Sequence, residues 1–325
     1  MSVEAPGPSA ARERIGTIDR EGPALDRLIA PDARIEKLAD GFVWTEGPVW
    51  VQEDGGYLLF SDVPANKMYR WSERDGVSVF LDPSGYDGPP TKDFREPGSN
   101  GLVPGPRGSI LMADHGNRAV ARLDLVTRRK TLLATHYQGR RFNSPNDLVR
   151  ARDGTIYFTD PPYGLEGLND SPVKEQPHNG VYRLDPGGSV TLLTGEMSFP
   201  NGIILSPDER TLYVANSDPT QAVIMAFLLD CGRIGHGRIL ADMTALVGPS
   251  MPGLPDGMAV DEAGNLFATG PGGVHVFTPA GERLGRIATG TAVANCAFGG
   301  QDGRTLFLAS HHMLARVRTR TGAAR

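Results

Sequence analysis

The sequence predicts an all-β protein, a six-bladed β-propeller with four-stranded blades. Two observations carry this prediction: a polar residue followed by a short apolar run recurs six times, and successive recurrences lie 39 to 55 residues apart. A repeat of about 40 to 50 residues that holds several short strands is typical of a propeller blade. The composition agrees, because 41 glycines and 26 prolines in 325 residues supply many turns and 39% hydrophobic residues supply a sizeable core.

Each repeat opens with an amide or carboxylate residue, which we call the head of the repeat. The heads are Glu46, Asn100, Asn146, Asn201, Asp256 and Asn295. After each head come an apolar run, a turn containing Gly or Asp, and a second strand-like run that ends in a polar residue. The second repeat predicts four strands near 100–104, 109–113, 119–123 and 130–134.

The last repeat contains only three predicted strands, so its outer edge needs a partner. An open strand edge invites unwanted pairing, and the spare strand-like stretch of the chain is residues 34–38, just before the first head. We therefore expect this N-terminal strand to close the ring as the outer strand of the last blade. Residues 1–32 would then be an N-terminal extension, packed on the surface or partly disordered, and residues 33–325 a single propeller domain.

Two long insertions interrupt the repeats, at residues 82–99 and 161–178. The first is rich in Gly, Pro and charged residues, and the second begins Pro161-Pro162-Tyr163-Gly164. Long loops on a closed scaffold often form lids or determine specificity.

The charge balance indicates a small-molecule partner. A net charge of −5 and an isoelectric point near 5.8 give no basic surface for nucleic acid or an anionic membrane. Cys231 and Cys296 lie far apart without ligand-like spacing, which argues against a disulfide framework or a thiolate metal site. The N-terminus lacks the apolar segment of a signal peptide, and no window holds 18 consecutive apolar residues. We expect a soluble cytoplasmic protein, either a monomer or a homodimer.

The repeat heads predict a metal site in the central channel. The innermost strand of each propeller blade lines the channel, so residues at equivalent positions of the six inner strands form one ring. This ring offers two carboxylates, Glu46 and Asp256, and four amide oxygens, with no Lys or Arg among the heads. Two such carboxylates repel one another unless one takes a proton or a cation lies between them. Oxygen ligands of this kind suit calcium first, then magnesium or manganese.

A simpler interpretation of the heads is that Asn-Gly and Asp-Gly pairs recur because every blade needs a turn. The metal ring is favoured over it because six heads stand in register, each followed by an apolar strand.

At these motifs the chain resembles the gluconolactonase family, which is related to regucalcin and more distantly to diisopropyl fluorophosphatase and paraoxonase. The resemblance spans nearly all of residues 40–318. The stretches that carry it are 46–50 (EGPVW), 113–118 (ADHGNR), 143–147 (NSPND), 157–164 (YFTDPPYG), 199–202 (FPNG) and 255–258 (PDGM).

The resemblance implies a channel metal and the hydrolysis of sugar-derived lactones. Glu46, Asn201 and Asp256 match the core ligands of the family, and Asn146 matches a ligand or a substrate contact. The metal is commonly calcium, with magnesium, manganese, zinc or iron as other candidates. This chain departs from the family pattern at residues 309–313 (ASHHM), where many relatives carry small hydroxyl residues.

Asp256 is the candidate general base. Opening a lactone requires a polarised carbonyl, an activated water and a protonated leaving group, and a bound metal can polarise the carbonyl. Asp256 is anionic and belongs to the predicted ring, so it is placed to take a proton from the attacking water. It could equally be a ligand only.

Histidines and a tyrosine supply further candidates. His115 ends the second strand of the second blade and is a candidate catalytic proton shuttle or substrate contact. Asn100 and Asn295 would complete the ring through water or substrate hydroxyls, Tyr163 would cover a sugar ring, and His311 is a candidate substrate contact. Asp147 is a possible supporting group, and Asp160 is expected to cap the backbone. We place His136, His178, His236 and His275 on the surface or in loops.

Two other functions remain open at this point. Related propellers hydrolyse phosphorus esters at a similar metal ring, so a phosphotriesterase-type hydrolase is one alternative. A non-catalytic propeller that binds a metal or ligand is the other, because the fold alone does not imply an enzyme.

Overall fold

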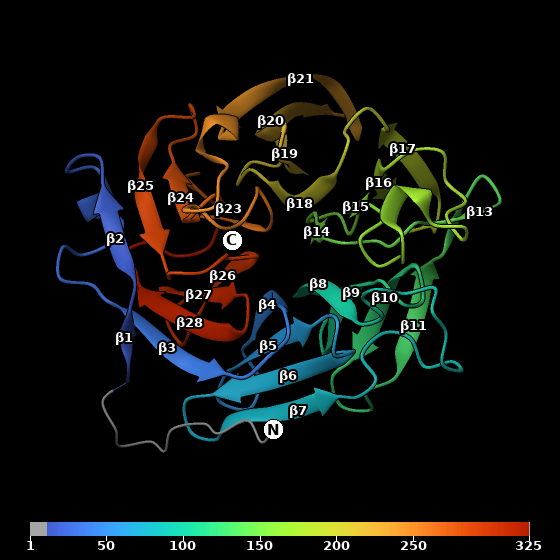
Figure 1. Cartoon of the computed structure of the whole chain (residues 1–325), viewed down its shortest axis with the longest axis horizontal. Helices are drawn as coiled ribbons and strands as arrows, with labels where there is room; N and C mark the ends of the chain where they lie inside the picture. Colours follow the sequence, from blue (N-terminus) through green and yellow to red (C-terminus); the bar gives the residue numbers. More distant parts are fainter. Residues whose placement is uncertain (1–11, 325) are drawn as a thin grey trace.

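The computed structural model describes residues 12–324, which form six antiparallel blades around a central channel (Figure 1). The blades follow chain order, and the first strand of each is innermost. The predicted six-bladed propeller with four-stranded blades is therefore confirmed. Its helical content in the described range is three short 3-10 segments, η1 (Leu25–Arg27), η2 (Leu168–Asp170) and η3 (Thr244–Leu246), and none of them could cross a membrane.

The first three blades come from residues 45–194. The first blade consists of β4 (Thr45–Val51), β5 (Tyr57–Asp62), β6 (Lys67–Ser72) and β7 (Gly76–Leu81). The second consists of β8 (Ser99–Pro104), β9 (Ser109–Asp114), β10 (Ala119–Asp124) and β11 (Lys130–Ala134), within one residue of the prediction at each end. A small hairpin of β12 (His136–Tyr137) and β13 (Arg140–Arg141) follows it. The third consists of β14 (Leu148–Arg150), β15 (Ile156–Asp160), β16 (Gly180–Leu184) and β17 (Val190–Thr194).

The last three blades complete the ring. The fourth blade consists of β18 (Pro200–Leu205), β19 (Thr211–Asp218), β20 (Gln221–Asp230) and β21 (Arg233–Asp242). The fifth consists of β22 (Met258–Val260), β23 (Leu266–Gly270), β24 (Gly273–Phe277) and β25 (Arg283–Ala288). The sixth consists of β26 (Asn295–Gly299), β27 (Thr305–Ser310), β28 (Met313–Arg318) and the N-terminal β3 (Ile35–Asp40).

The N-terminal strand closes the ring as predicted. β3 pairs antiparallel with β28, with Ile35 opposite Val317 and Ala39 opposite Leu314. The chain before β3 also packs on the propeller: β1 (Arg14–Ile15) pairs with β3, and β2 (Thr17–Arg20) pairs with β25. The fifth and sixth blades therefore each have a fifth, outermost strand. Residues 1–11 of the predicted extension lie outside the described residues.

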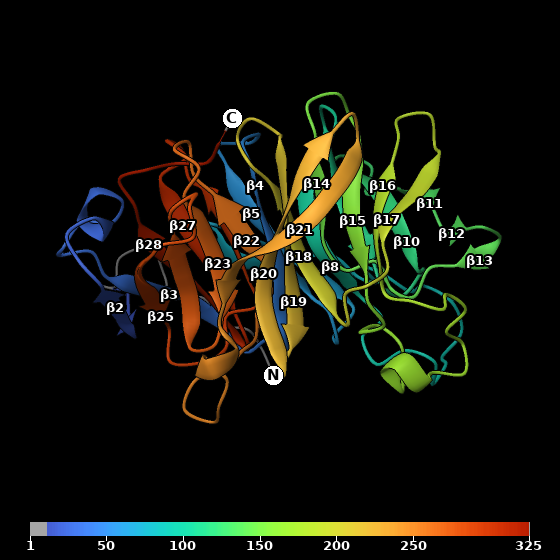
Figure 2. The same ribbon diagram turned by 90° about the horizontal axis from the view of Figure 1, so that it is seen from above.

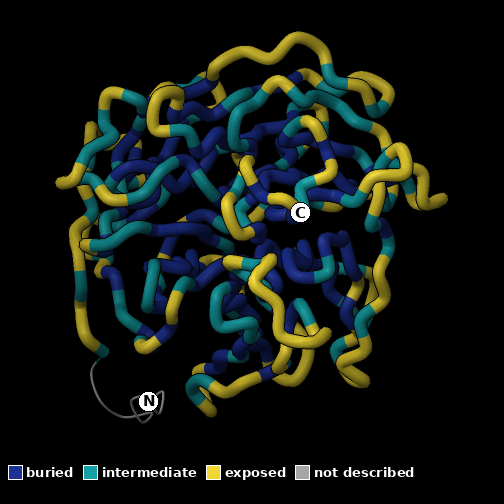
Figure 3. The backbone as a smooth tube through the Cα atoms, turned by 45° about the vertical axis from the view of Figure 1, so that its right-hand side comes forward, coloured by how far each residue is buried: buried dark blue, intermediate teal, exposed yellow. Residues whose placement is uncertain are grey.

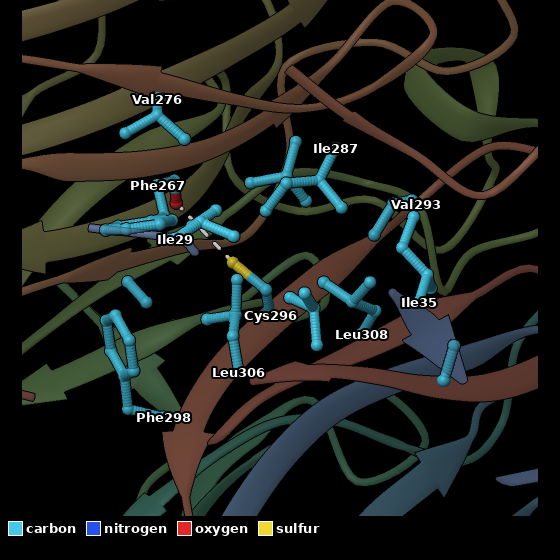
Figure 4. Packing of buried hydrophobic residues seen from close by; sticks show 14 of the residues in the cluster. Ile29, Ile35, Phe267, Val276, Ile287, Val293, Cys296, Phe298, Leu306 and Leu308 are labelled. Carbon is cyan, nitrogen blue, oxygen red and sulfur yellow. Dashed lines mark hydrogen bonds between the residues drawn. The ribbon is translucent and has the colours of Figure 1, made fainter. Parts of the chain in front are cut away.

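A hydrophobic cluster joins the last two blades to this N-terminal segment. Phe267 of the fifth blade and Leu308 of the sixth pack with Ile29 and Ile35, and all four are at most 2% exposed (Figure 4). Cys296 lies in the same cluster, where its thiol approaches the carbonyl of Phe267 at 3.4 Å. Burying these side chains stabilises the closure by the hydrophobic effect. Figure 3 shows buried chain around the channel and exposed chain in the outer connections.

The six inner strands contact one another in sequence around the channel, from β4 to β26 and back to β4. The glycine after a head makes this close approach possible. Gly47 has φ +49°, and a Cβ there would lie 2.1 Å from the carbonyl oxygen of Asn100 on the next blade. A Cβ on Gly257 would lie 2.0 Å from the side chain of Asn295. Gly47 therefore lies within an inner strand, and Gly257 directly precedes one. The alternative that the Asn-Gly and Asp-Gly pairs recur because every blade needs a turn is wrong.

The two faces of the ring differ. The connections that carry η2 and η3 project from one face, and the described C-terminal residues lie toward the other (Figure 2). On that second face Thr321 donates to Asp261, and the amide of Ala324 donates to the carbonyl of Val260. The long insertions therefore extend the channel mouth on the η2 and η3 face.

His275 is buried in the fifth blade, so its placement on the surface or in a loop is wrong. It lies in β24, is fully buried, and its Nε2 lies 2.9 Å from the carbonyl oxygen of Pro271. Burial lowers the pKa of His275 from 6.5 to about 4. The alternation of Val274, His275 and Val276 gave no sign that this face of the strand is also covered.

We expect His275 to make the fold sensitive to acid. The unfolded side chain titrates near pH 6.5 and the folded one near 4, so the unfolded state binds the extra proton between these values. The free energy of unfolding should fall over this range, by up to about 3 kcal/mol from this group. His275→Gln should reduce the pH slope in urea unfolding measured between pH 7 and 4. The exposed His236→Gln should not, and equal slopes for His275→Gln and the wild type would contradict the assignment.

Candidate active site

The predicted heads meet at the inner ends of the blades. Glu46, Asn100, Asn201 and Asn295 lie in the inner strands, and Asn146 and Asp256 stand two residues before β14 and β22. Asp256 is partly exposed, and the other five heads are buried, at most 7% exposed. The equivalent placement follows from the repeat, because each head occupies the same end of an inner strand.

A chain of hydrogen bonds connects the amide heads across neighbouring blades. Asn100 Nδ2 donates to Asn146 Oδ1 at 2.7 Å, and Asn146 Nδ2 donates to Asn201 Oδ1. Asn201 Nδ2 then donates to Ser217 Oγ at 3.0 Å, and Ser217 donates to the carbonyl of Pro255. The chain therefore runs from the second blade to the residue before Asp256 and fixes the orientation of each amide. Ser217 was not predicted; it lies on the second strand of its blade and is not a head.

Glu46 is held by the sixth blade. Asn295 Nδ2 donates to Glu46 Oε2 at 3.1 Å, and the amide of Gly47 donates to the same oxygen at 2.9 Å. The Oδ1 of Asn295 accepts from the amide of Cys296 at 2.8 Å. Asn295 therefore positions Glu46. Asn295 also lines a second, largely apolar cavity of about 440 Å³ toward the opposite end of the channel.

The ring opens into a pocket of about 650 Å³ at the channel mouth that carries the insertions. Five of the six heads line it together with side chains from the loops. These heads are Glu46, Asn100, Asn146, Asn201 and Asp256, and the predicted Tyr163 joins them from the second insertion. An apolar part of the wall comes from Val247, Met251 and Leu254, in the connection that follows η3. The pocket has the size typical of small-molecule sites.

Among the lining residues that the sequence did not predict, three carry a charge or a large aromatic ring. Arg95 and Glu96 come from the insertion 82–99, and Trp44 stands just before β4. None of them occupies a repeated position, so the search for heads could not find them. The signal that pointed to the first two was the length and charge of their insertion.

The carboxylates of the ring carry a strong electrostatic penalty. Burial raises the pKa of Asp256 well above its ordinary value, and the nearby charges of Glu46, Asp147 and Glu96 raise it further. Burial also raises the pKa of Glu46, with smaller contributions in the same direction from Asp147 and Glu96. A cation would be stabilised where the charge of one carboxylate, Glu46, raises the pKa of a second, Asp256.

The donor set fits a hard divalent cation. Glu46 and Asp256 line the same pocket as Asn100, Asn146 and Asn201, and Oδ1 of Asn100 is buried without a hydrogen-bond partner in the described chain. Within residues 12–324, no group of three or more His, Cys, Asp or Glu side chains is arranged as a metal site. A site here would therefore draw part of its ligands from asparagine.

His115 lies behind the pocket wall. It is fully buried, its Nε2 lies 3.0 Å from Asn146 Oδ1, and its Nδ1 lies 3.6 Å from Glu96 Oε2. Because Asn146 Oδ1 is an acceptor, His115 Nε2 carries the hydrogen. Burial lowers the pKa of His115 to about 4, so the imidazole is neutral. It can orient Asn146 and is one side chain removed from the pocket.

The other predicted substrate contacts are placed differently. Tyr163 reaches the pocket, and its ring stacks on Phe199 with centroids 5.7 Å apart. His311 does not line the pocket; it packs edge-on against Trp44, with centroids 5.1 Å apart. His311 can therefore influence the pocket only by supporting Trp44.

Asp147 and Asp160 both hold backbone amides. Asp147 Oδ1 accepts from Leu148 and its Oδ2 from Ile203, at 2.9 and 3.3 Å, and burial raises its pKa to about 7. Asp160 accepts from the amides of Asn143 and Ser144 at 2.8 and 2.9 Å, which is the capping role expected from the sequence.

The fold and the site define a six-bladed propeller with a polar small-molecule pocket at one channel mouth. The family model described as "SMP-30/Gluconolactonase/LRE-like region" matches residues 44–312. The chain is 47% identical over 312 residues to a gluconolactonase from Zymomonas mobilis, which covers 94% of this chain and 87% of that relative. This protein belongs to the SMP-30/gluconolactonase/LRE-like family, as its motifs predicted.

Two solved structures agree with this assignment. A gluconolactonase from Xanthomonas campestris matches with a TM-score of 0.81 and 33% identity, covering 98% of this chain and 100% of that one. Regucalcin from Agrobacterium tumefaciens, described as a calcium-binding protein, matches with a TM-score of 0.65 and 19% identity, covering 88% of this chain and 95% of that one. The second likeness shows the fold alone.

Asn146 should be essential to the hydrogen-bond chain. Asn146→Ala leaves Asn100 Nδ2, His115 Nε2 and Asn201 Oδ1 without this partner in a buried site. We expect a loss of about 1–3 kcal/mol in the free energy of unfolding, measured by urea denaturation. The exposed Glu262→Ala is the control and should change it by less than about 0.5 kcal/mol. A stability of Asn146→Ala equal to that of the control would show that the chain contributes little.

Proposed function

We propose that this protein opens sugar-derived lactones of the gluconolactone type to the corresponding acids. The enzyme class predicted from the sequence, a lactonase, is confirmed by the 47% identical gluconolactonase, which matches most of the chain. One observation carries the proposal to this particular pocket. Glu46, Asp256 and the amide of Asn201 line a single cavity of small-molecule size, at the channel mouth framed by the insertions.

The proposal includes one divalent cation. Its ligands would be Glu46, Asn146, Asn201 and Asp256. The charge of Glu46, which raises the pKa of Asp256, favours a cation, and the oxygen-only donors favour calcium, with magnesium, manganese, zinc or iron as alternatives. The bound cation would supply a Lewis acid that polarises the lactone carbonyl and acidifies water.

Asp256 is the proposed general base. It is the head of the ring that is partly exposed to the pocket, so one of its carboxylate oxygens can reach a water beside the lactone carbonyl. The water attacks the carbonyl carbon while Asp256 takes a proton from it. As the ring C–O bond breaks, Asp256 can return this proton to the departing ring oxygen, which balances the hydrolysis.

Asn100, Asn146 and Tyr163 are the proposed substrate contacts. Asn100 and Asn146 present amides at the base of the pocket, which suits hydrogen bonding to hydroxyl groups. The ring of Tyr163 is fixed by stacking on Phe199 and offers a flat surface to a sugar ring. Asn295 and His311 act one step further away, through Glu46 and Trp44.

Metal removal tests the proposal. Purified protein should contain about one divalent ion per chain, and a chelator should abolish acid release from gluconolactone in a pH-indicator assay. Activity should return when the ion found by metal analysis is added. Activity that survives complete metal removal would contradict the cation. No acid release from any aldonolactone would favour a binding protein, and a preference for organophosphates would favour a phosphotriesterase.

Asp256→Asn separates the role of base from the role of ligand. The amide keeps an oxygen donor but accepts no proton, so kcat should fall by about 100-fold or more while metal content remains near that of the wild type. Asp153→Asn, in an exposed hairpin turn of the third blade, is the control and should leave both unchanged. If Asp256→Asn keeps metal and turnover, Asp256 is not the base; if it loses both, Asp256 acts first as a ligand.

A further inference from the structure

The two insertions form one wall of the pocket. Phe94 and Leu165 form an antiparallel bridge, the amide of Arg95 donates to the carbonyl of Gly164 at 3.0 Å, and the amide of Glu166 donates to the carbonyl of Asp93 at 2.8 Å. The connection between the first and second blades is thus joined backbone to backbone with the connection between β15 and β16 of the third blade. This junction carries Arg95, Glu96 and Tyr163 into the pocket.

The base of the first insertion is anchored to the second blade. Lys130 Nζ lies 3.0 Å from the buried Asp114 and donates to the carbonyl of Ser84 at 3.1 Å. Within the insertion, the rings of Tyr86 and Phe94 pack with centroids 4.9 Å apart. These contacts make the wall a fixed part of the pocket, so the position of Glu96 is preorganised.

Glu96 is the pocket carboxylate that lies outside the repeat. Its side chain is 16% exposed, and Arg95 donates to its Oε1. Its other oxygen, Oε2, has His115 Nδ1 at 3.6 Å, which is too long for a hydrogen bond. Arg95 is the hydrogen-bond donor that the described chain supplies to this carboxylate. A carboxylate can accept about four hydrogen bonds, so Glu96 keeps acceptor sites for a ligand.

The charges of the pocket also limit what can bind. Glu46, Glu96 and Asp256 line it with one basic residue, Arg95, which is already paired with Glu96. A bound divalent cation would offset the two ring carboxylates. The remaining charges, Arg95 and Glu96, neutralise each other. No unpaired basic side chain of the pocket is then left to receive a phosphate or carboxylate on the substrate.

We propose that Glu96 is a specificity-determining residue. It accepts hydrogen bonds from the hydroxyl groups of the lactone, so the site selects polyhydroxylated lactones over hydroxyl-poor ones. Its pairing with Arg95 makes the site select uncharged lactones over phosphorylated ones. The inference rests on the proposed lactonase function and names its substrate class. Glu96 binds the sugar hydroxyls, whereas the ring of heads, including Asp256, acts at the lactone carbonyl.

Variants at Glu96 test this assignment. Glu96→Ala should lower kcat/KM for glucono-δ-lactone by about 10- to 100-fold, because hydrogen bonds to a charged group are lost. It should change kcat/KM for δ-valerolactone, which has no hydroxyls, by less than about twofold. Glu96→Gln retains an acceptor but releases Arg95 from its ion pair. It should therefore raise kcat/KM for 6-phosphogluconolactone relative to gluconolactone by about 10-fold.

Glu166→Ala is the matched control, since it removes an exposed carboxylate from the partner insertion. It should leave all three values unchanged. Metal content and thermal midpoint should stay at the wild-type level in the Glu96 variants. An equal fall on gluconolactone and δ-valerolactone, loss of metal in Glu96→Ala, or an unchanged phosphate selectivity in Glu96→Gln would overturn the inference and leave the lactonase function standing. A wild type that opens none of these lactones would overturn both.

Discussion

The close approach of the six inner strands is the constraint on which the rest of the structure depends. The blades can converge on the channel only where the residue at the contact has no Cβ, because an atom of the neighbouring blade occupies that space. Gly47 and Gly257 meet this condition, with a neighbouring atom about 2 Å from the position of a Cβ. The residue beside each of these glycines then faces the channel. The geometry that packs the blades therefore also gathers the heads, and one short motif serves both the fold and the site.

The resulting ring is costly for the isolated chain. It places the buried Glu46 and the partly exposed Asp256 on one pocket, where the charges of Glu46 and Asp147 raise the pKa of Asp256. Hydrogen bonds from the Gly47 amide and from Asn295 to Glu46 offset part of this cost. Hydrogen bonds among the amides fix Asn100, Asn146 and Asn201 in one orientation each. A site arranged in this way is preorganised, because little has to move when a cation or substrate arrives.

The repeated features of the protein could be predicted from its sequence, and the unrepeated ones could not. Six heads in register gave the number of blades, and the missing strand of the last blade led to β3. The pocket wall formed by Arg95 and Glu96 depends on two insertions meeting in space, which no periodicity records. Likewise, His311 was predicted as a substrate contact from its place in the stretch 309–313, but packing against Trp44 decides where its ring lies.

Burial was also hard to foresee where a second layer covers a strand. His275 was placed on the surface or in a loop, yet it is fully buried in a strand. The chain before β3 looked like a separate extension, although β1 and β2 add strands to two blades. In both cases the missing information was which distant segment packs on which edge.

The closure by β3 has a consequence for how the protein is made on the ribosome. β3 belongs to the sixth blade, whose other strands span residues 295–318, so the segment translated early must wait for one translated near the end. Until then, the edges of both terminal segments lack their partners. Contacts between segments so far apart in the chain form slowly, and unpaired strand edges favour aggregation. The ring therefore becomes a single cooperative unit only when the last blade forms, because β3 and β28 then cover each other's edges.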